Sequence, residues 1–169
     1  MEYSISPEGE KFKIPSDEDY KKEYDKLVKI AEEQKKQGRE IVVVMGLGFV
    51  GAVMAGVVAD SVDKKTGEPK KFVIGMQRPS PRSFWKIPLF NRGVSPVKAE
   101  DPEVAPMIAR CVNDKKTMIA TYTYDALKLA DVLVVDVQCD YMKQSLGDLK
   151  TGHAEITALE ESFKIIGEK

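Results

Sequence analysis

Three glycines in the first third of the chain have the spacing of a phosphate-binding turn. Gly46, Gly48 and Gly51 form a G-x-G-x-x-G pattern directly after the aliphatic run 41–44 and before the small, apolar run 52–59. In this context the first glycine allows a tight turn, the second lets a pyrophosphate approach the backbone, and the third lets a helix pack closely on the strand. The free N–H groups and the positive dipole end of that helix would face the phosphate. The pattern therefore predicts a nucleotide-binding strand–turn–helix unit.

An alternation of strand and helix signals predicts the elements that position this turn. We expect strands at residues 41–45, 71–76, 118–121 and 132–137, and helices at residues 17–37, 52–59, 101–108, 124–130 and 157–166. Such alternation is typical of a parallel sheet with helices on both faces. The sequence thus predicts an α/β, Rossmann-type domain over residues 40–169. An N-terminal extension, residues 1–39, holds an arm and an amphipathic helix that packs on the sheet or on a partner subunit.

Composition excludes several kinds of partner. The formal net charge is −1 and lysines and acids are interspersed, so the net charge gives no reason to expect nucleic acid or an anionic membrane as a partner. The apolar run 41–59 is interrupted by four glycines, which argues against a membrane span, and residues 1–40 are too polar for a signal peptide. Cys111 and Cys139 lack a metal-binding spacing, and we expect two reduced thiols in a cytoplasmic protein.

Three motifs, taken in order, resemble one enzyme family. The segment Gly46-Leu47-Gly48-Phe49-Val50-Gly51 resembles a G-x-G-[YF]-V-G turn, whose aromatic–Val–Gly ending is more specific than glycines alone. Asn91-Arg92-Gly93, followed by Ser95-Pro96 and Glu100, is similar to an Asn-x-Gly segment with a later proline and acid. Ala130-Asp131-Val132 resembles the start of a strand that ends at the cofactor. Over residues 40–169 the chain therefore resembles the N-terminal NAD-binding domain of the nucleotide-sugar 6-dehydrogenases, which act on UDP-glucose, UDP-N-acetylmannosamine or GDP-mannose.

The resemblance implies a cytoplasmic, homo-oligomeric oxidoreductase of polysaccharide biosynthesis. Such enzymes oxidise the C6 alcohol of a UDP- or GDP-sugar to a carboxylate with two NAD(P)⁺ and a cysteine in a second half of the protein. The glycine-rich motif of that cysteine is missing here. We therefore expect the cofactor-binding portion of a longer enzyme, inactive alone, and assign this chain no catalytic residue and no metal ligand.

The cofactor-binding residues expected from the glycine turn and the resemblance fall into three groups. Those at the pyrophosphate are Gly46, Gly48, Phe49, Val50 and Gly51; those at the adenosine ribose are Gln77 and Arg78; those lining the rest of the cleft are Tyr122, Thr123, Val137 and Cys139.

The chain departs from the family at two of these positions. The family ends its second strand with an acid that holds the ribose hydroxyls, and Gln77-Arg78 stands there instead. Because an arginine suits a 2′-phosphate, both NAD and NADP stay open, as does the alternative that Arg78 points to solvent. Cys139 replaces a threonine. It lacks an evident base, since the single histidine, His153, is 14 residues further on, so we expect a cofactor-lining or inert thiol rather than a nucleophile.

Two other functions remain as alternatives. One is a nucleotide-binding or assembly module without chemistry of its own, which the missing catalytic motif and the extra N-terminal helix favour. The other is a Rossmann dehydrogenase of the 6-phosphogluconate or hydroxyacid type. The Phe49-Val50-Gly51 ending and the Asn-x-Gly segment argue against the latter.

Overall fold

The chain is divided into two compact units. The computed structural model describes residues 2–143, 145 and 152–169. The first unit is Met1–Asp136 and the second is Val137–Lys169, and each is described by itself. The division that we predicted between residues 39 and 40 stays a prediction.

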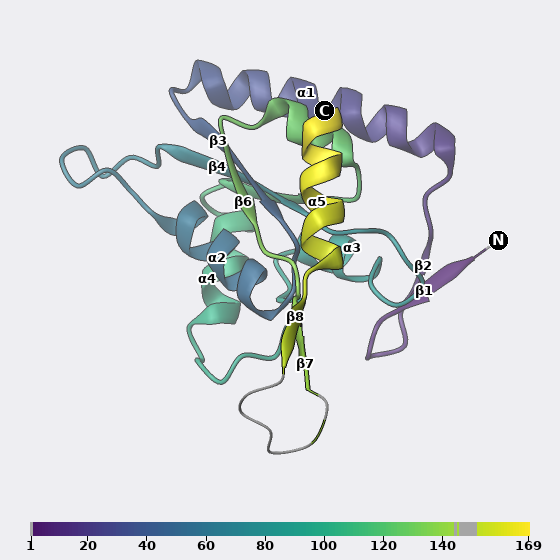
Figure 1. Cartoon of the computed structure of the whole chain (residues 1–169). Helices are drawn as coiled ribbons and strands as arrows, with labels where there is room; N and C mark the ends of the chain where they lie inside the picture. Colours follow the sequence, from purple (N-terminus) through teal and green to yellow (C-terminus); the bar gives the residue numbers. More distant parts are fainter. Residues whose placement is uncertain (1, 144, 146–151) are drawn as a thin grey trace. The chain divides into compact units, whose positions relative to one another are not determined.

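A four-stranded parallel sheet forms the centre of the first unit (Figure 1). Its strands are β3 (Glu40–Met45), β4 (Lys71–Met76), β5 (Met118–Thr121) and β6 (Val132–Val135), in the order β5-β4-β3-β6. All three strand pairs are parallel, as the alternating pattern predicted. The strand expected at 132–137 ends at Val135, two residues early.

The strand order creates a switch point at β3. From β3 the chain moves outward to β4 and then β5, and it returns to place β6 on the opposite side of β3, with Met45 paired with Val135. In open α/β sheets, ligands bind at the carboxyl ends of the strands where the winding direction reverses. The end of β3, and thus the glycine turn, lies at this position.

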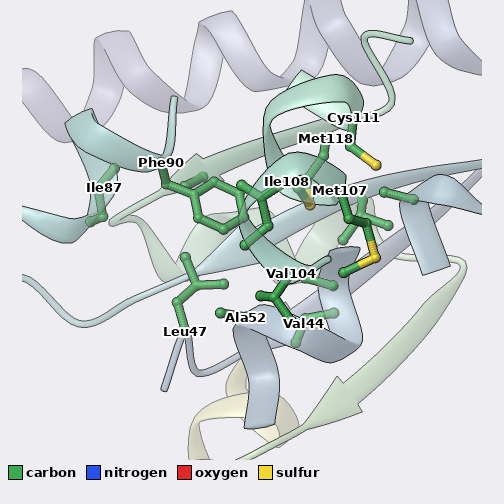
Figure 2. Close-up of a cluster of buried hydrophobic side chains, with 14 of the residues drawn as sticks. Val44, Leu47, Ala52, Ile87, Phe90, Val104, Met107, Ile108, Cys111 and Met118 are labelled. Atoms are coloured by element: carbon green, nitrogen blue, oxygen red, sulfur yellow. The ribbon is translucent and has the colours of Figure 1, made fainter. Parts of the chain in front are cut away.

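One face of the sheet is covered by α2 (Phe49–Asp60), α3 (Lys86–Phe90) and α4 (Val104–Asn113), as Figures 1 and 2 show. Val42 and Val44 of β3 belong to the buried core on this face. The buried positions of α2 are all alanine or glycine, so its backbone comes close to its neighbours; a Cβ at Gly56 would lie 2.6 Å from Cε of Met107 in α4. The predicted helices in this layer are confirmed, and α3 is an additional short helix in the long connection after β4.

The other face carries α1 (Asp17–Lys36) and the 3₁₀-helix η1 (Tyr124–Leu129). Leu27 and Ala31 of α1 are buried, and α1 contacts both β3 and η1. At the start of α1, the Asp19 carboxylate accepts hydrogen bonds from the Ser16 N–H and hydroxyl. We predicted that this helix packs on the sheet or on a partner subunit, and the structure shows it packed on the sheet. The segment predicted as a helix at 124–130 is a 3₁₀-helix, a form that short connections often adopt.

The N-terminal arm contains a hairpin that was not expected from its sequence. Strands β1 (Tyr3–Ile5) and β2 (Lys11–Lys13) pair antiparallel. Gly9 closes the turn with φ +89°, a conformation in which a side chain is strained, and its N–H donates to the Ser6 carbonyl. Three-residue strands with few apolar residues carry too weak an alternation signal to be predicted.

The second unit contains a short hairpin and a helix. Strands β7 (Asp140–Met142) and β8 (His153–Glu155) pair antiparallel, and α5 (Thr157–Glu168) follows. The helix was predicted and the two strands were not. His153 and Cys139 are both exposed in this unit.

An ion-pair network joins α2 to α4 and gives the first testable prediction. Arg110 binds both carboxylate oxygens of Asp60, at 2.9 and 2.7 Å, and the Lys115 ammonium lies 2.8 Å from the same carboxylate. The hydrogen bonds from Arg110, followed by those from Lys115, hold the pKa of Asp60 well below its usual range. Because the folded state lowers this pKa, the stabilisation is full above the ordinary carboxylate pKa and is lost as the pH falls below about 4.

We therefore expect Asp60→Asn to lower the free energy of unfolding by about 1–2 kcal/mol at pH 7 and to flatten the loss of stability between about pH 5 and 2. Urea unfolding at a series of pH values measures both effects. Asp114→Asn is the matched control, since Asp114 is exposed and its substitution is expected to change little. Equal acid sensitivity in the wild type and in Asp60→Asn would show that the network does not stabilise the fold.

Candidate functional site

The glycine turn joins β3 to α2 at the switch point. Gly46 has φ +106°, and its N–H donates to the carbonyl of Met76 at the end of β4, 2.8 Å away. Gly48 is the N-cap of α2, with φ −75° and ψ −164°. The turn is thus anchored to the neighbouring strand at its first residue and opens into the helix at its third.

The three glycines are required for different reasons. A Cβ added at Gly46 would lie 2.0 Å from the backbone oxygen of Asp136, and one added at Gly51 would lie 2.0 Å from the backbone oxygen of Gly46. Backbone atoms of the protein therefore leave no room for a side chain at Gly46 or Gly51. A Cβ at Gly48 would meet no atom within 4 Å. The space over Gly48 is open, as expected where a ligand approaches the backbone.

The first turn of α2 offers backbone donors without a competing side chain. No side-chain hydrogen bond caps this helix end and no acidic residue lies in its first turn, within the described residues. Phe49 and Val50 are 60% and 58% exposed, and the Ala52 N–H makes the first helical bond, to the carbonyl of Gly48. The preceding N–H groups lack a helical acceptor because of their place in the helix. Gly48, Phe49, Val50 and Gly51 could therefore hold a diphosphate.

Gln77, at the end of β4, contacts the turn directly. Its side-chain carbonyl accepts a hydrogen bond from the Leu47 N–H at 3.1 Å, and its own N–H donates to the Thr121 carbonyl at 3.0 Å. The structure thus brings Gln77 into contact with the glycine turn, a contact that the sequence did not indicate, and its place at the adenosine ribose stays a prediction. Arg78, the next residue, is exposed, and its carbonyl accepts from the Ser83 hydroxyl.

Asp136 follows β6 and lies beside the turn. Its N–H donates to the Met45 carbonyl at 2.8 Å, and its carboxylate lies 2.6 Å from the place that a Gly51 Cβ would take. An alanine at position 51 would therefore meet atoms on two sides. Val137 and Cys139 follow Asp136 but belong to the second unit. Their position in a cofactor cleft stays a prediction.

Tyr122 and Thr123 follow β5 and already have structural contacts. The Tyr122 ring packs edge-on against Tyr20 at 5.1 Å, and its hydroxyl donates to the Asp19 carbonyl at 3.1 Å. Burial, together with the nearby carboxylates of Glu23 and Asp19, raises the pKa of the Tyr122 hydroxyl to about 12. The buried Thr123 hydroxyl caps η1 by accepting the Asp125 N–H. These contacts show how both residues are held, and their part in binding a cofactor stays a prediction.

Other contacts in this region were not expected from the sequence. The Ser4 hydroxyl, fully buried, donates to the Pro81 carbonyl and accepts from the Trp85 N–H, at 2.8 and 3.0 Å. The N-terminal hairpin is thereby attached to the loop after β4, and only long-range pairing information could have indicated it. Asn91 of the Asn-x-Gly segment bonds both the N–H and the carbonyl of Ala120, on the edge strand β5.

Cys111 is a buried thiol of the core. Burial raises the pKa of the Cys111 thiol to about 11. Among residues 2–143, 145 and 152–169, no group of three or more His, Cys, Asp or Glu side chains could hold a metal ion. Within the same residues, no helix is long and apolar enough to cross a membrane.

Comparison with solved structures identifies what this arrangement resembles. No family model matches the chain, and no curated protein matches it in sequence. The NDP-N-acetyl-D-galactosaminuronic acid dehydrogenase of Methanosarcina mazei Go1 matches 81% of the chain with 26% identity and a TM-score of 0.62. The GDP-mannose dehydrogenase of Pseudomonas aeruginosa matches 75% of it with 25% identity and a TM-score of 0.55. These structural neighbours are nucleotide-sugar dehydrogenases.

The resemblance that three short motifs indicated is thus found in the fold as well. The chain spans 27% and 24% of the length of the two nucleotide-sugar dehydrogenases.

Proposed function

We propose that this chain is the nicotinamide-dinucleotide-binding portion of a nucleotide-sugar dehydrogenase. The observation that carries the proposal is the glycine turn at the switch point. Backbone atoms occupy the space that a side chain would need at Gly46 and Gly51, whereas the space beside Gly48 is open. The enzyme would oxidise the C6 alcohol of a UDP- or GDP-sugar to a carboxylate. A cytoplasmic location, a homo-oligomeric assembly and a role in polysaccharide biosynthesis belong to the same proposal.

The chain's own part in this function is to hold and orient the cofactor. When bound, the nicotinamide dinucleotide supplies the hydride acceptor, which no side chain can replace. The pyrophosphate would lie over Gly48 and accept hydrogen bonds from the first N–H groups of α2. The Leu47 N–H is already bonded to Gln77, so the donors begin at Gly48. This bond ties Gln77 to the turn, and the Gln77 side chain would lie near the ribose of a bound dinucleotide.

Ligand titration of this chain tests the proposal. A ligand that binds only the folded state stabilises it by about 2.7 kcal/mol at 100 times its Kd, so NAD⁺ or NADP⁺ is expected to raise Tm in a thermal-shift titration. UDP-glucose and GDP-mannose should raise it much less, because we place the sugar site in the rest of the enzyme. If neither dinucleotide shifts Tm or binds by calorimetry, the proposed cofactor role is wrong.

The same titration separates the two alternatives. A nucleotide-binding module without chemistry would bind ADP or ATP as well as it binds a dinucleotide, whereas a dehydrogenase portion gains from the nicotinamide half. The structural neighbours support the nucleotide-sugar family over the 6-phosphogluconate and hydroxyacid types.

A further inference from the structure

The segment that follows the glycine-turn helix carries an unusual concentration of positive charge. Residues 69–99 contain no aspartate or glutamate, in a chain whose net charge is −1. The seven basic residues of this segment are Lys70, Lys71, Arg78, Arg82, Lys86, Arg92 and Lys98. The segment includes β4 and the loop at its carboxyl end, next to Gln77.

The cations of the loop after β4 have no acidic partner among the described residues. Lys71 pairs with Glu40 and Arg92 pairs with Glu10. Arg78, Arg82 and Lys86 take part in none of the ion pairs formed in the described part of the chain. Unpaired cations on one short loop raise the local positive potential and favour an anion of the ligand.

Gln77 lacks the carboxylate that accepts hydrogen bonds from both ribose hydroxyls, and its amide can donate to a phosphate. An aspartate or glutamate at this position accepts hydrogen bonds from both ribose hydroxyls. The carbonyl oxygen of Gln77 already accepts the Leu47 N–H, so its NH₂ group is the main polar group left to offer. Two N–H donors match the oxygens of a phosphate, and the side chain has no negative charge to repel one.

The loop is held in one conformation by contacts within the first unit. The Ser83 hydroxyl donates to the Arg78 carbonyl at 2.8 Å, and the Ser83 and Phe84 N–H groups donate to the Ser80 carbonyl. The buried Ser4 hydroxyl bonds Pro81 and Trp85 at the far end of the loop. A loop ordered before the ligand arrives loses less conformational entropy on binding.

From these observations we infer that the loop 77–86 binds the 2′-phosphate of NADP(H), so that the chain prefers NADP to NAD. Gln77 donates to the phosphate, Arg78 supplies the nearest positive charge, and Ser4 is a positioning residue that orders the loop. The inference rests on the proposed function and specifies which cofactor it uses.

Calorimetric titration of the full chain tests the inference with two matched ligand pairs. NADP⁺ differs from NAD⁺, and 2′,5′-ADP from 5′-AMP, only by the 2′-phosphate. We expect the phosphorylated member of each pair to bind at least about tenfold more tightly, because charge-assisted hydrogen bonds are the strong ones. The preference should decrease with added salt.

Gln77→Glu is the decisive variant, because it keeps an oxygen for the Leu47 N–H and replaces the NH₂ group by a charged oxygen. It is expected to lower NADP⁺ affinity about tenfold or more and to leave NAD⁺ affinity equal or improved. Arg78→Gln should lower NADP⁺ affinity alone. Lys98→Gln removes an equal charge from an exposed site outside the loop and should leave the preference for NADP⁺ unchanged.

The outcomes separate this inference from the proposed function. Tight NAD⁺ binding without a preference for the 2′-phosphate, or a preference unchanged in Gln77→Glu, would overturn the inference alone. Absence of binding by all four ligands would overturn the proposed function and the inference with it. If Lys98→Gln weakens the preference for NADP⁺ as much as Arg78→Gln does, the preference depends on net charge alone and the assigned site is wrong.

Discussion

Replacement of Gly48 by alanine is expected to leave the chain folded and to weaken dinucleotide binding by roughly tenfold or more. Gly48 has φ −75°, which alanine adopts without strain, and its added Cβ would meet no atom of the protein within 4 Å. The cost to the fold is therefore limited to a weaker N-cap, on the order of 0.5 kcal/mol. The same methyl group would occupy the space where we place the pyrophosphate. Dinucleotide affinity should therefore fall while the free energy of unfolding changes little.

Gly51→Ala is the matched variant that should affect both properties. Its Cβ would lie 2.0 Å from the backbone oxygen of Gly46 and 2.6 Å from the Asp136 carboxylate. Backbone cannot move aside cheaply, so we expect a loss of about 3 kcal/mol or more in the free energy of unfolding. Urea unfolding and dinucleotide titration on both variants make the comparison. If Gly48→Ala binds NAD⁺ and NADP⁺ as the wild type does, the pyrophosphate does not lie over Gly48.

Strong periodic patterns explain why most of the fold was predictable. The aliphatic runs of β3, β4 and β6 and the apolar stripe of α1 each repeat over enough residues to indicate both the element and its buried face. The hairpins β1–β2 and β7–β8 have strands of three residues, too short for such a signal. The 3₁₀ form of η1 was also missed, because its six residues have the composition of an ordinary helix.

In the candidate site, too, local features were predictable and long-range contacts were not. The glycine turn was predictable because its spacing expresses local backbone constraints within six residues. The contact of Gln77 with Leu47 spans 30 residues and that of Ser4 with Pro81 spans 77 residues, and no local pattern encodes either. The sequence shows that position 77 holds a glutamine where the family has an acid. The hydrogen bond that this glutamine accepts from the Leu47 N–H appears only in the folded structure.

Phe90→Ala is expected to lower the free energy of unfolding by about 3–5 kcal/mol, the usual cost of deleting a buried aromatic ring. Phe90 is fully buried at the end of α3, and Figure 2 shows its ring pointing into the core toward Ile108 of α4. Its neighbours cannot close the cavity easily, since α4 is also held to α2 by the bond from Arg110 to Asp60. Such a loss is a large part of the 5–15 kcal/mol that stabilises a typical domain.

Phe163→Ala is the control for this change, because it removes the same ring from a side chain that is 58% exposed on α5. Its effect should stay within about 0.5 kcal/mol. Urea unfolding followed by circular dichroism suits both variants, since both units contain helices, and Trp85 fluorescence additionally follows the segment just before α3. If the two substitutions cost equal free energy, then the segment from the loop after β4 to α3 is not packed as the structure has it. That result would also contradict the conformation of the loop 77–86, which we assign to the 2′-phosphate.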